Sequence, residues 1–323
     1  MKRRTLLKLT LALPAALAIS VNAHAQDWPS QPIRLISPSP SGGAADVATR
    51  LIAKHLSELV GQPVIVDNRP GGNGVVAGLE ALRGGKDGYS VFMGSTTTLV
   101  ANPYLMKHVP FDPATDFVPV AMVASLPFVL VVNPSLPVKS VKEFIAYAKD
   151  RPGKVTFGSA NATSLVAAST FNQMAGIEMF NVPYKGAPAS LTDVVGGEID
   201  SAFVDYSTAR ALIQSNRLRL LAVTSAKRSP LMPQTPTLSE SGLPGYEVIG
   251  WTAMSVPAGV HPSIVQRLNR EMQKILSRKD VQEQLATLGQ DYILKSPEEF
   301  ASFLRTERPR WARMIRNAGI KPD

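Results

Sequence analysis

The 323-residue sequence contains no cysteine, which excludes disulfide bonds, cysteine-ligated zinc and thiol catalysis. Histidine is scarce, and His55, His108 and His261 do not have the spacing of metal ligands. The G-x-S-x-G signature of a hydrolase nucleophile elbow is missing. Lysine and arginine form no long run, which argues against nucleic-acid binding. Together these absences weigh against an enzyme, although an exported α/β enzyme stays open as an alternative.

Long apolar runs are also absent, except at the start of the chain. A basic segment is followed by the apolar stretch Leu9–Val21, and Ala23–Ala25 fits the small-x-small pattern of a cleavage site. We therefore predict a signal peptide over residues 1–25 and periplasmic export, by the Sec route or, given Arg3 and Arg4, by the twin-arginine route. The processed chain carries 30 Lys and Arg against 25 Asp and Glu, a net charge of only +5.

Apolar, β-branched runs alternate with helical patterns along the rest of the chain. Their weak polar alternation is typical of strands that are buried on both faces. The predicted strands are residues 32–39, 63–68, 89–95, 119–125, 154–159, 179–184, 201–206 and 218–224. This β-α-β series predicts an α/β fold with parallel-rich sheets flanked by helices.

Several helix signals are local. In residues 44–61 an apolar stripe is expected at Val47, Leu51, Ile52, Leu56 and Leu59, with His55 partly exposed beside it. Capping boxes are expected where Ser140 precedes Glu143 and where Ser296 precedes Glu299. The Pro-rich segment 227–245 is expected to be a long connector.

One glycine-rich segment resembles a nucleotide-binding fingerprint. Residues 72–77, GNGVVA, match G-x-G-x-x-A after a strand. However, RPG separates the glycines from that strand, and Asp87 precedes the next strand rather than ending it. We therefore interpret this segment as a loop that opens a helix, and we expect no cofactor.

Four loops that follow predicted strands share a composition. They are residues 37–46, 94–98, 158–164 and 205–208, all rich in small or hydroxylated residues at the start of a helix. Ligands of open α/β sheets bind at the carboxyl ends of strands, and helix N-termini attract carboxylates and phosphates. Each loop alone is better explained by ordinary helix capping. Their combination favours a site for a small anionic ligand.

The sequence closely resembles the Bug family, the extracytoplasmic substrate-binding proteins of tripartite tricarboxylate transporters. The resemblance rests on residues 32–53, 61–94, 182–200 and 221–247, and it extends in order over essentially all of the processed chain. It implies a two-lobed, type II-like Venus flytrap that captures a small organic carboxylate in the cleft between its lobes. It also implies a monomer that delivers this ligand to a tripartite tricarboxylate-type membrane permease or, in some members, to a sensor kinase.

The resemblance also implies a set of ligand-binding residues. Gly42, Gly43, Ala44 and Asp46 match the family's first carboxylate-holding loop, and Asp205 matches its usual acidic position. In the second loop the chain departs from the family, which has more glycine and a histidine soon afterward, whereas this chain has Leu165 and Val166 in that neighbourhood. The predicted ligand-binding residues are Ser39, Gly42, Gly43, Ala44, Asp46, Ser95, Thr96, Thr97, Ser159, Ala160, Asn161, Thr163, Ser164 and Asp205, with no metal site and no catalytic residue.

The expected organisation is a lobe made of residues 26–125 and 250–323 and a second lobe made of residues 126–249. Two crossovers, near Ala124–Leu126 and Gly250–Trp251, would form the hinge. The identity of the carboxylate depends on side chains at the far end of the cleft, and the sequence does not predict it.

Overall fold

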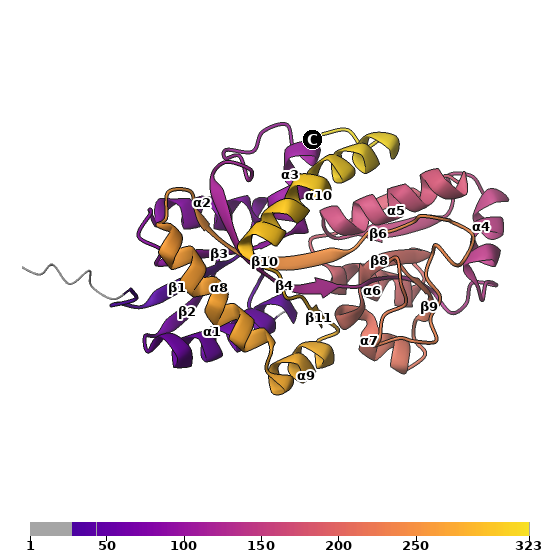
Figure 1. Ribbon diagram of the computed structural model, residues 1–323. Coiled ribbons are helices and arrows are strands. Elements are labelled where there is room, and N and C mark those ends of the chain that lie inside the picture. The colour runs from indigo at the N-terminus through magenta and orange to yellow at the C-terminus, as the bar shows by residue number, and fades with distance from the viewer. Residues whose placement is uncertain (1–27, 43, 323) are drawn as a thin grey trace, which may run out of the picture.

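The computed structural model describes residues 28–42 and 44–322. The predicted signal peptide and Gly43 lie outside the described residues. Two lobes lie side by side, each built on one sheet with helices on both faces (Figure 1). The predicted two-lobed α/β fold is therefore confirmed.

The first lobe is built on a six-stranded sheet with the order β11-β4-β10-β3-β1-β2. Helices α1 and α8 cover one face of this sheet, and α2 and α10 cover the other. The elements of this lobe are β1 (Ile33–Ser37), α1 (Ala44–Val60), β2 (Val64–Asn68), η1 (Gly72–Gly74), α2 (Val75–Arg83), β3 (Ser90–Ser95), η2 (Thr97–Ala101), α3 (Asn102–Leu105), β4 (Phe117–Leu126), β10 (Gly250–Pro257), α8 (Pro262–Leu276), α9 (Lys279–Thr287), β11 (Asp291–Tyr292) and α10 (Pro297–Asn317).

The second lobe is built on a five-stranded sheet with the order β7-β6-β8-β5-β9. Helix α5 packs on one face, and α6 and α7 pack on the other. The elements of this lobe are β5 (Phe128–Val132), α4 (Val141–Lys149), β6 (Thr156–Ser159), α5 (Ala162–Ala175), β7 (Phe180–Pro183), α6 (Ala187–Gly196), β8 (Ser201–Asp205), α7 (Tyr206–Gln214) and β9 (Arg219–Val223).

Both sheets are mixed, although the sequence pattern favoured parallel-rich ones. The pairs β1–β2, β1–β3, β6–β7 and β6–β8 are parallel, as a β-α-β series requires. The remaining pairs are antiparallel, and they involve β4, β5 or β10. The chain crosses from the first lobe to the second between β4 and β5, and it returns at β10. The antiparallel pairs therefore occur where the chain leaves one sheet and joins the other.

The buried face of α1 differs from the predicted stripe. Ile52 and Leu56 are buried as expected, but Val47 and Leu59 are 42% and 38% exposed. Ala48 and Ala53 are buried in their place, because small side chains let α1 approach α8 and the sheet closely. His55 lies on this buried face of α1 and is only 4% exposed, so its predicted partial exposure was wrong.

One apolar core extends through both lobes, whereas two others belong to one lobe each. The shared core contains Phe92 and Phe300 of the first lobe together with Phe144 and Phe171 of the second. Trp251, on the crossing strand β10, lies fully buried in it and makes edge-on contacts with Phe300 and Phe303. On the opposite faces, the cores beneath α1 and α8 and beneath α6 and α7 are separate. Among the described residues, the apolar core that the lobes share thus lies on one side of the molecule.

The local helix signals have different outcomes. The expected capping box of Ser296 and Glu299 is present at the start of α10. At the start of α4 only half of the expected box forms, because the Ser140 side chain accepts from the Glu143 N–H but the Glu143 side chain accepts from the Lys139 N–H. The GNGVVA segment opens α2, and residues 227–245 contain no helix and no strand, as expected. Within the described residues, no helix combines the length and apolar character needed to cross a membrane.

Candidate functional site

The β1–α1 loop is held in shape by the carboxylate of Asp46. Its Oδ2 accepts a hydrogen bond from the Gly42 N–H at 2.8 Å and another from Arg50 Nε at 2.9 Å. Gly42 has φ of 85°, a left-handed conformation that glycine adopts without strain. Asp46 is only 1% exposed, so its carboxylate is shielded from solvent.

Asn68 completes this network from the neighbouring strand. Its Nδ2 donates to the Ser39 carbonyl at 2.9 Å and to Asp46 Oδ1 at 2.8 Å, and its Oδ1 accepts from Arg50 Nη2 at 2.9 Å. Asn68 ends β2, directly opposite Ser37 in the parallel register with β1. The sequence analysis missed both Asn68 and Arg50. One signal in the sequence could have indicated Asn68, because it is a polar residue at the carboxyl end of the strand that follows the first helix.

The surroundings of Asp46 also shift its titration. Burial opposes its ionisation, but the hydrogen bonds from Arg50, Gly42 and Asn68 outweigh burial and hold the pKa of Asp46 below its ordinary value of 3.8. Asp46 is therefore ionised near neutral pH and acts as an internal anion for the loop. Because Gly42 donates to it, the Gly42 N–H already has a partner. Ala44 begins α1.

The loop after β3 is turned into the protein rather than outward. The buried Thr96 accepts a hydrogen bond on Oγ1 from the Trp251 N–H at 2.9 Å, and Thr98 Oγ1 accepts one from the Ser95 N–H at 2.8 Å. Thr97 begins η2 and is partly exposed. The hydroxyl of Thr96 thus fixes the crossing strand β10 to the first lobe.

In the second lobe, residues 159–164 form a capped helix start. The Asn161 side chain accepts from the Ser164 N–H, and Ser164 Oγ accepts from the N–H groups of Ala160 and Asn161. Thr163 and Ser164 are buried. Ser159 Oγ is bonded to Asn181 Oδ1 at 2.7 Å. Ala162 and Thr163 belong to the first turn of α5, where N–H groups have no acceptor within the helix itself.

Asp205 caps α7. Its Oδ1 accepts hydrogen bonds from the Thr208 N–H at 3.0 Å, from Thr208 Oγ1 at 2.7 Å and from Ser207 Oγ. The two lobes are in contact near Asp205. On α7, Arg210 Nη1 donates a hydrogen bond to the Thr287 carbonyl of the first lobe at 2.9 Å. Gly289 lies against Ser207 so closely that a Cβ there would be 3.1 Å from the Ser207 nitrogen.

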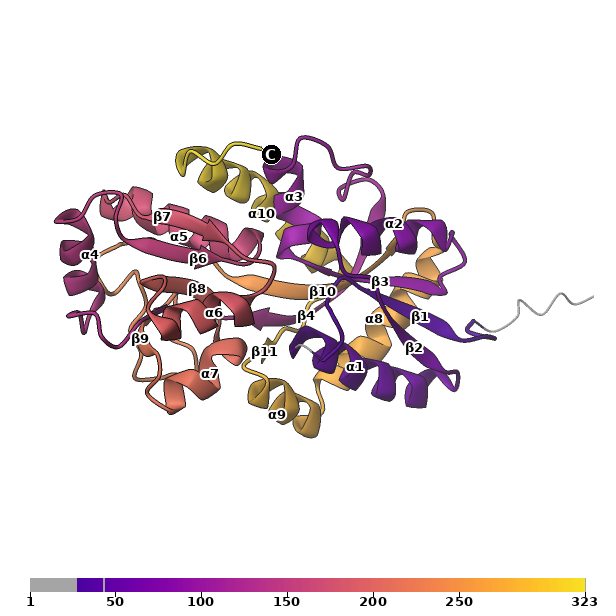
Figure 2. The same cartoon turned by 180° about the vertical axis from the view of Figure 1, so that it is seen from behind.

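The predicted residues therefore form four local groups at the carboxyl ends of β1, β3, β6 and β8. Figure 2 shows the amino-terminal end of α1 near the middle of the molecule, toward the second lobe. Among the described residues, no hydrogen bond joins the β1–α1 loop to the β6–α5 loop. The assignment of these residues to ligand binding stays a prediction.

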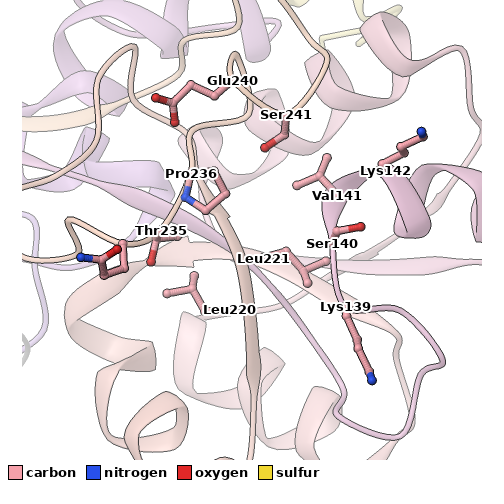
Figure 3. A pocket seen from close by; sticks show the side chains of 11 residues that line it. Lys139, Ser140, Val141, Lys142, Leu220, Leu221, Thr235, Pro236, Glu240 and Ser241 are labelled. Atoms are coloured by element: carbon pink, nitrogen blue, oxygen red, sulfur yellow. The ribbon is translucent and has the colours of Figure 1, made fainter.

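Two hollows lie away from these loops. One, of about 620 Å³, lies between the start of α4, strand β9 and the connector, where Lys139 and Lys142 extend away from it (Figure 3). The other, of about 510 Å³, lies between α5 and residues 318–320. No cluster of three or more potential metal-ligating side chains occurs in residues 28–42 and 44–322.

Comparison with known proteins identifies the family. The model of the tripartite tricarboxylate transporter family receptor matches residues 48–320. The chain belongs to the tripartite tricarboxylate transporter receptor family. Protein BugT of Bordetella pertussis is 34% identical over 95% of each chain. The resemblance to the Bug family is thereby confirmed.

Solved structures of this family agree with the fold. R. palustris Rpa4515 with adipate is 34% identical, with a TM-score of 0.86, over 92% of this chain and 100% of that one. MatC from Rhodopseudomonas palustris with bound malate is 25% identical, with a TM-score of 0.80, over 89% of this chain and 100% of that one. Members of the family are periplasmic solute-binding proteins and not enzymes, and this chain is a solute-binding protein of that kind.

Proposed function

We propose that this receptor-family protein binds a small organic carboxylate between its lobes and delivers it to a tripartite tricarboxylate-type permease. The observation that carries the proposal is the match to a solved relative that holds adipate, at 34% identity and a TM-score of 0.86. Malate, in a second relative, is also a dicarboxylate. A compound with two carboxylates is therefore the first choice of ligand.

The chemistry of two helix starts supports this assignment. Helices α1 and α5 begin directly after β1 and β6, and a helix N-terminus presents N–H groups and a partial positive charge to an anion. Neither loop contains a lysine or arginine between residues 37 and 45 or between 158 and 164. Recognition would then depend on backbone N–H groups and hydroxyls, with each charge-assisted hydrogen bond worth about 1.5–3 kcal/mol.

The arrangement of the cores supports binding between two moving lobes. The lobes share a core on the side of α10 and α5 but have separate cores beneath α1 and α6. We infer that residues 26–125 with 250–323 move as one lobe against residues 126–249, about the paired crossings of β4 and β10. A ligand that contacts both lobes favours the closed form. A radius of gyration that stays constant on saturation with ligand would refute this movement.

Calorimetry on the processed protein tests binding, with adipate and L-malate as probes and the neutral diamide of adipate as the control. Saturable binding of either acid, and none of the diamide, is expected. Gly42→Ala and Gly85→Ala form a matched pair, because both glycines have φ near +85° (85° and 83°) and no atom within 4 Å of an added Cβ. Only Gly42→Ala should weaken binding. If neither acid nor any other carboxylate in a wider panel binds, the proposal fails.

Delivery needs its own test. A strain that lacks the gene for this protein should lose uptake of the bound carboxylate and regain it with the wild-type gene. Normal uptake in that strain would refute delivery. Ligand-dependent capture of a sensor kinase would instead favour signalling.

A further inference from the structure

We propose that Asn68 is a positioning residue for ligand binding, which holds the β1–α1 loop in its anion-accepting shape without touching the ligand. This inference rests on the proposed function, because it assumes that the loop receives a carboxylate. Asn68 lies on β2, where it is opposite Ser37 in the strand register, and its side chain reaches Ser39 and Asp46.

The first step is the position of the amide. Ser37 and Asn68 are opposite each other at the ends of parallel strands, and the Arg69 N–H donates to the Ser37 carbonyl at 2.7 Å. This pairing places the Asn68 side chain beside the first residues of the loop. Its two Nδ2 hydrogen bonds then join Ser39, near the start of the loop, to Asp46, in the first turn of α1.

The second step is the direction of each hydrogen bond. The Nδ2 group donates twice, to a carbonyl and to a carboxylate, while Oδ1 accepts from the Arg50 guanidinium. Only an amide offers two donors and an acceptor from one short side chain. Aspartate has the same shape but no donor when ionised, so the position requires asparagine for chemical reasons and not for its volume.

The third step is the consequence for the ligand. Asp46 is a buried anion at the start of the helix that would receive the ligand's carboxylate, and like charges close together repel. The amide of Asn68 and the guanidinium of Arg50 hold the charge of Asp46 against β2 and the Gly42 N–H. Without Asn68, the Asp46 carboxylate would lose one of its hydrogen-bond donors, and the Ser39 carbonyl would lose the donor that holds it to β2.

The substitution Asn68→Asp gives a sharp test, because it keeps the shape and replaces the hydrogen bond to Asp46 by repulsion between two carboxylates. Two ionised carboxylates at this spacing raise the pKa of one of them. At pH 8 the variant should bind adipate or L-malate, whichever the wild type binds, at least about tenfold more weakly than the wild type. As the pH falls toward about 5, protonation of one of the two carboxyl groups restores a donor, so the affinity of the variant relative to that of the wild type at the same pH should recover. The exposed Asn317→Asp is the control for added charge.

A second measurement does not depend on any ligand. Backbone hydrogen exchange of residues 36–42 should be faster in Asn68→Ser than in the wild type, with exchange in the second lobe unchanged. Asn68→Ser adds no charge, so it serves also if Asn68→Asp fails to fold. If no carboxylate binds the wild type, the proposed function fails, and this exchange experiment still decides whether Asn68 holds the loop. Unchanged exchange in residues 36–42, or a pH profile of Asn68→Asp parallel to that of the wild type, would overturn the inference.

Discussion

Replacing Thr96 by valine should destabilise the protein without weakening its affinity for ligand. Thr96 is one of the predicted ligand-binding residues, yet its hydroxyl accepts a hydrogen bond from the Trp251 N–H at 2.9 Å. Both residues are 1% exposed. Valine has nearly the same shape, so the change leaves a buried N–H without an acceptor but opens no large cavity.

The expected cost follows from that single lost acceptor. A buried donor left without a partner costs about 1–3 kcal/mol. For a chain of this size such a loss lowers the melting temperature by a few degrees, at about 2–4 °C per kcal/mol. Trp251 lies within the core that the two lobes share, so its fluorescence should follow the unfolding of that core.

The assay is urea unfolding followed by tryptophan fluorescence, with Thr97→Val as the matched control. Thr97 is the next residue, is partly exposed, and its hydroxyl makes no hydrogen bond with the residues that the structure describes. Thr96→Val should unfold at a lower urea concentration than Thr97→Val, and its dissociation constant should stay within about twofold of that of the wild type. Equal unfolding midpoints for the two variants would contradict the structural role of Thr96, and a large loss of affinity in Thr96→Val alone would make it a ligand contact.

Three further outcomes are expected. The pKa of Asp46 lies below 3.8 in the folded protein, so its stabilising contribution is present above that pH and is lost as the pH falls through the lower folded value. The urea midpoint of Asp46→Asn should therefore depend less on acid pH than that of the wild type. Identical dependence of the two midpoints on pH would refute this role. Gly289→Ala should destabilise more than Gly319→Ala, since both have φ near +70° (71° and 70°) but only the first meets Ser207; equal losses would count against a close contact between the lobes. Mass spectrometry of the periplasmic protein should find a chain that starts near Gln26, and an uncleaved N-terminus would disprove the signal peptide.

The sequence predicted β1 to β4 and β6 to β9 in their order, because that order depends on local periodicity and turn residues, but the predicted strands did not include β5, β10 or β11. It predicted the buried face of α1 less well. Counting only large apolar side chains selected Val47 and Leu59, whereas close packing against α8 selected Ala48 and Ala53. The burial of His55 follows from the same choice. Alanine favours close helix packing but has little weight in a hydrophobic stripe, so the sequence alone did not reveal this face.

The site depends more strongly on contacts between distant residues. Thr96 and Trp251 are 155 positions apart, and the chain gives no local signal that the hydroxyl of one receives the N–H of the other. Asn68 is 22 positions from Asp46, and its role requires the parallel register of β1 and β2. Loop composition could indicate where an anion would bind, but not which polar groups already have partners.

A crystal structure of the protein with its tightest-binding carboxylate tests the central claim most directly. We expect electron density for the ligand between the lobes, with one carboxylate at the amino-terminal turns of α1 and α5 and with Asn68 outside contact distance. Ligand bound only in the hollow beside Lys139 and Leu220, or at any site on a single lobe, would contradict the claim.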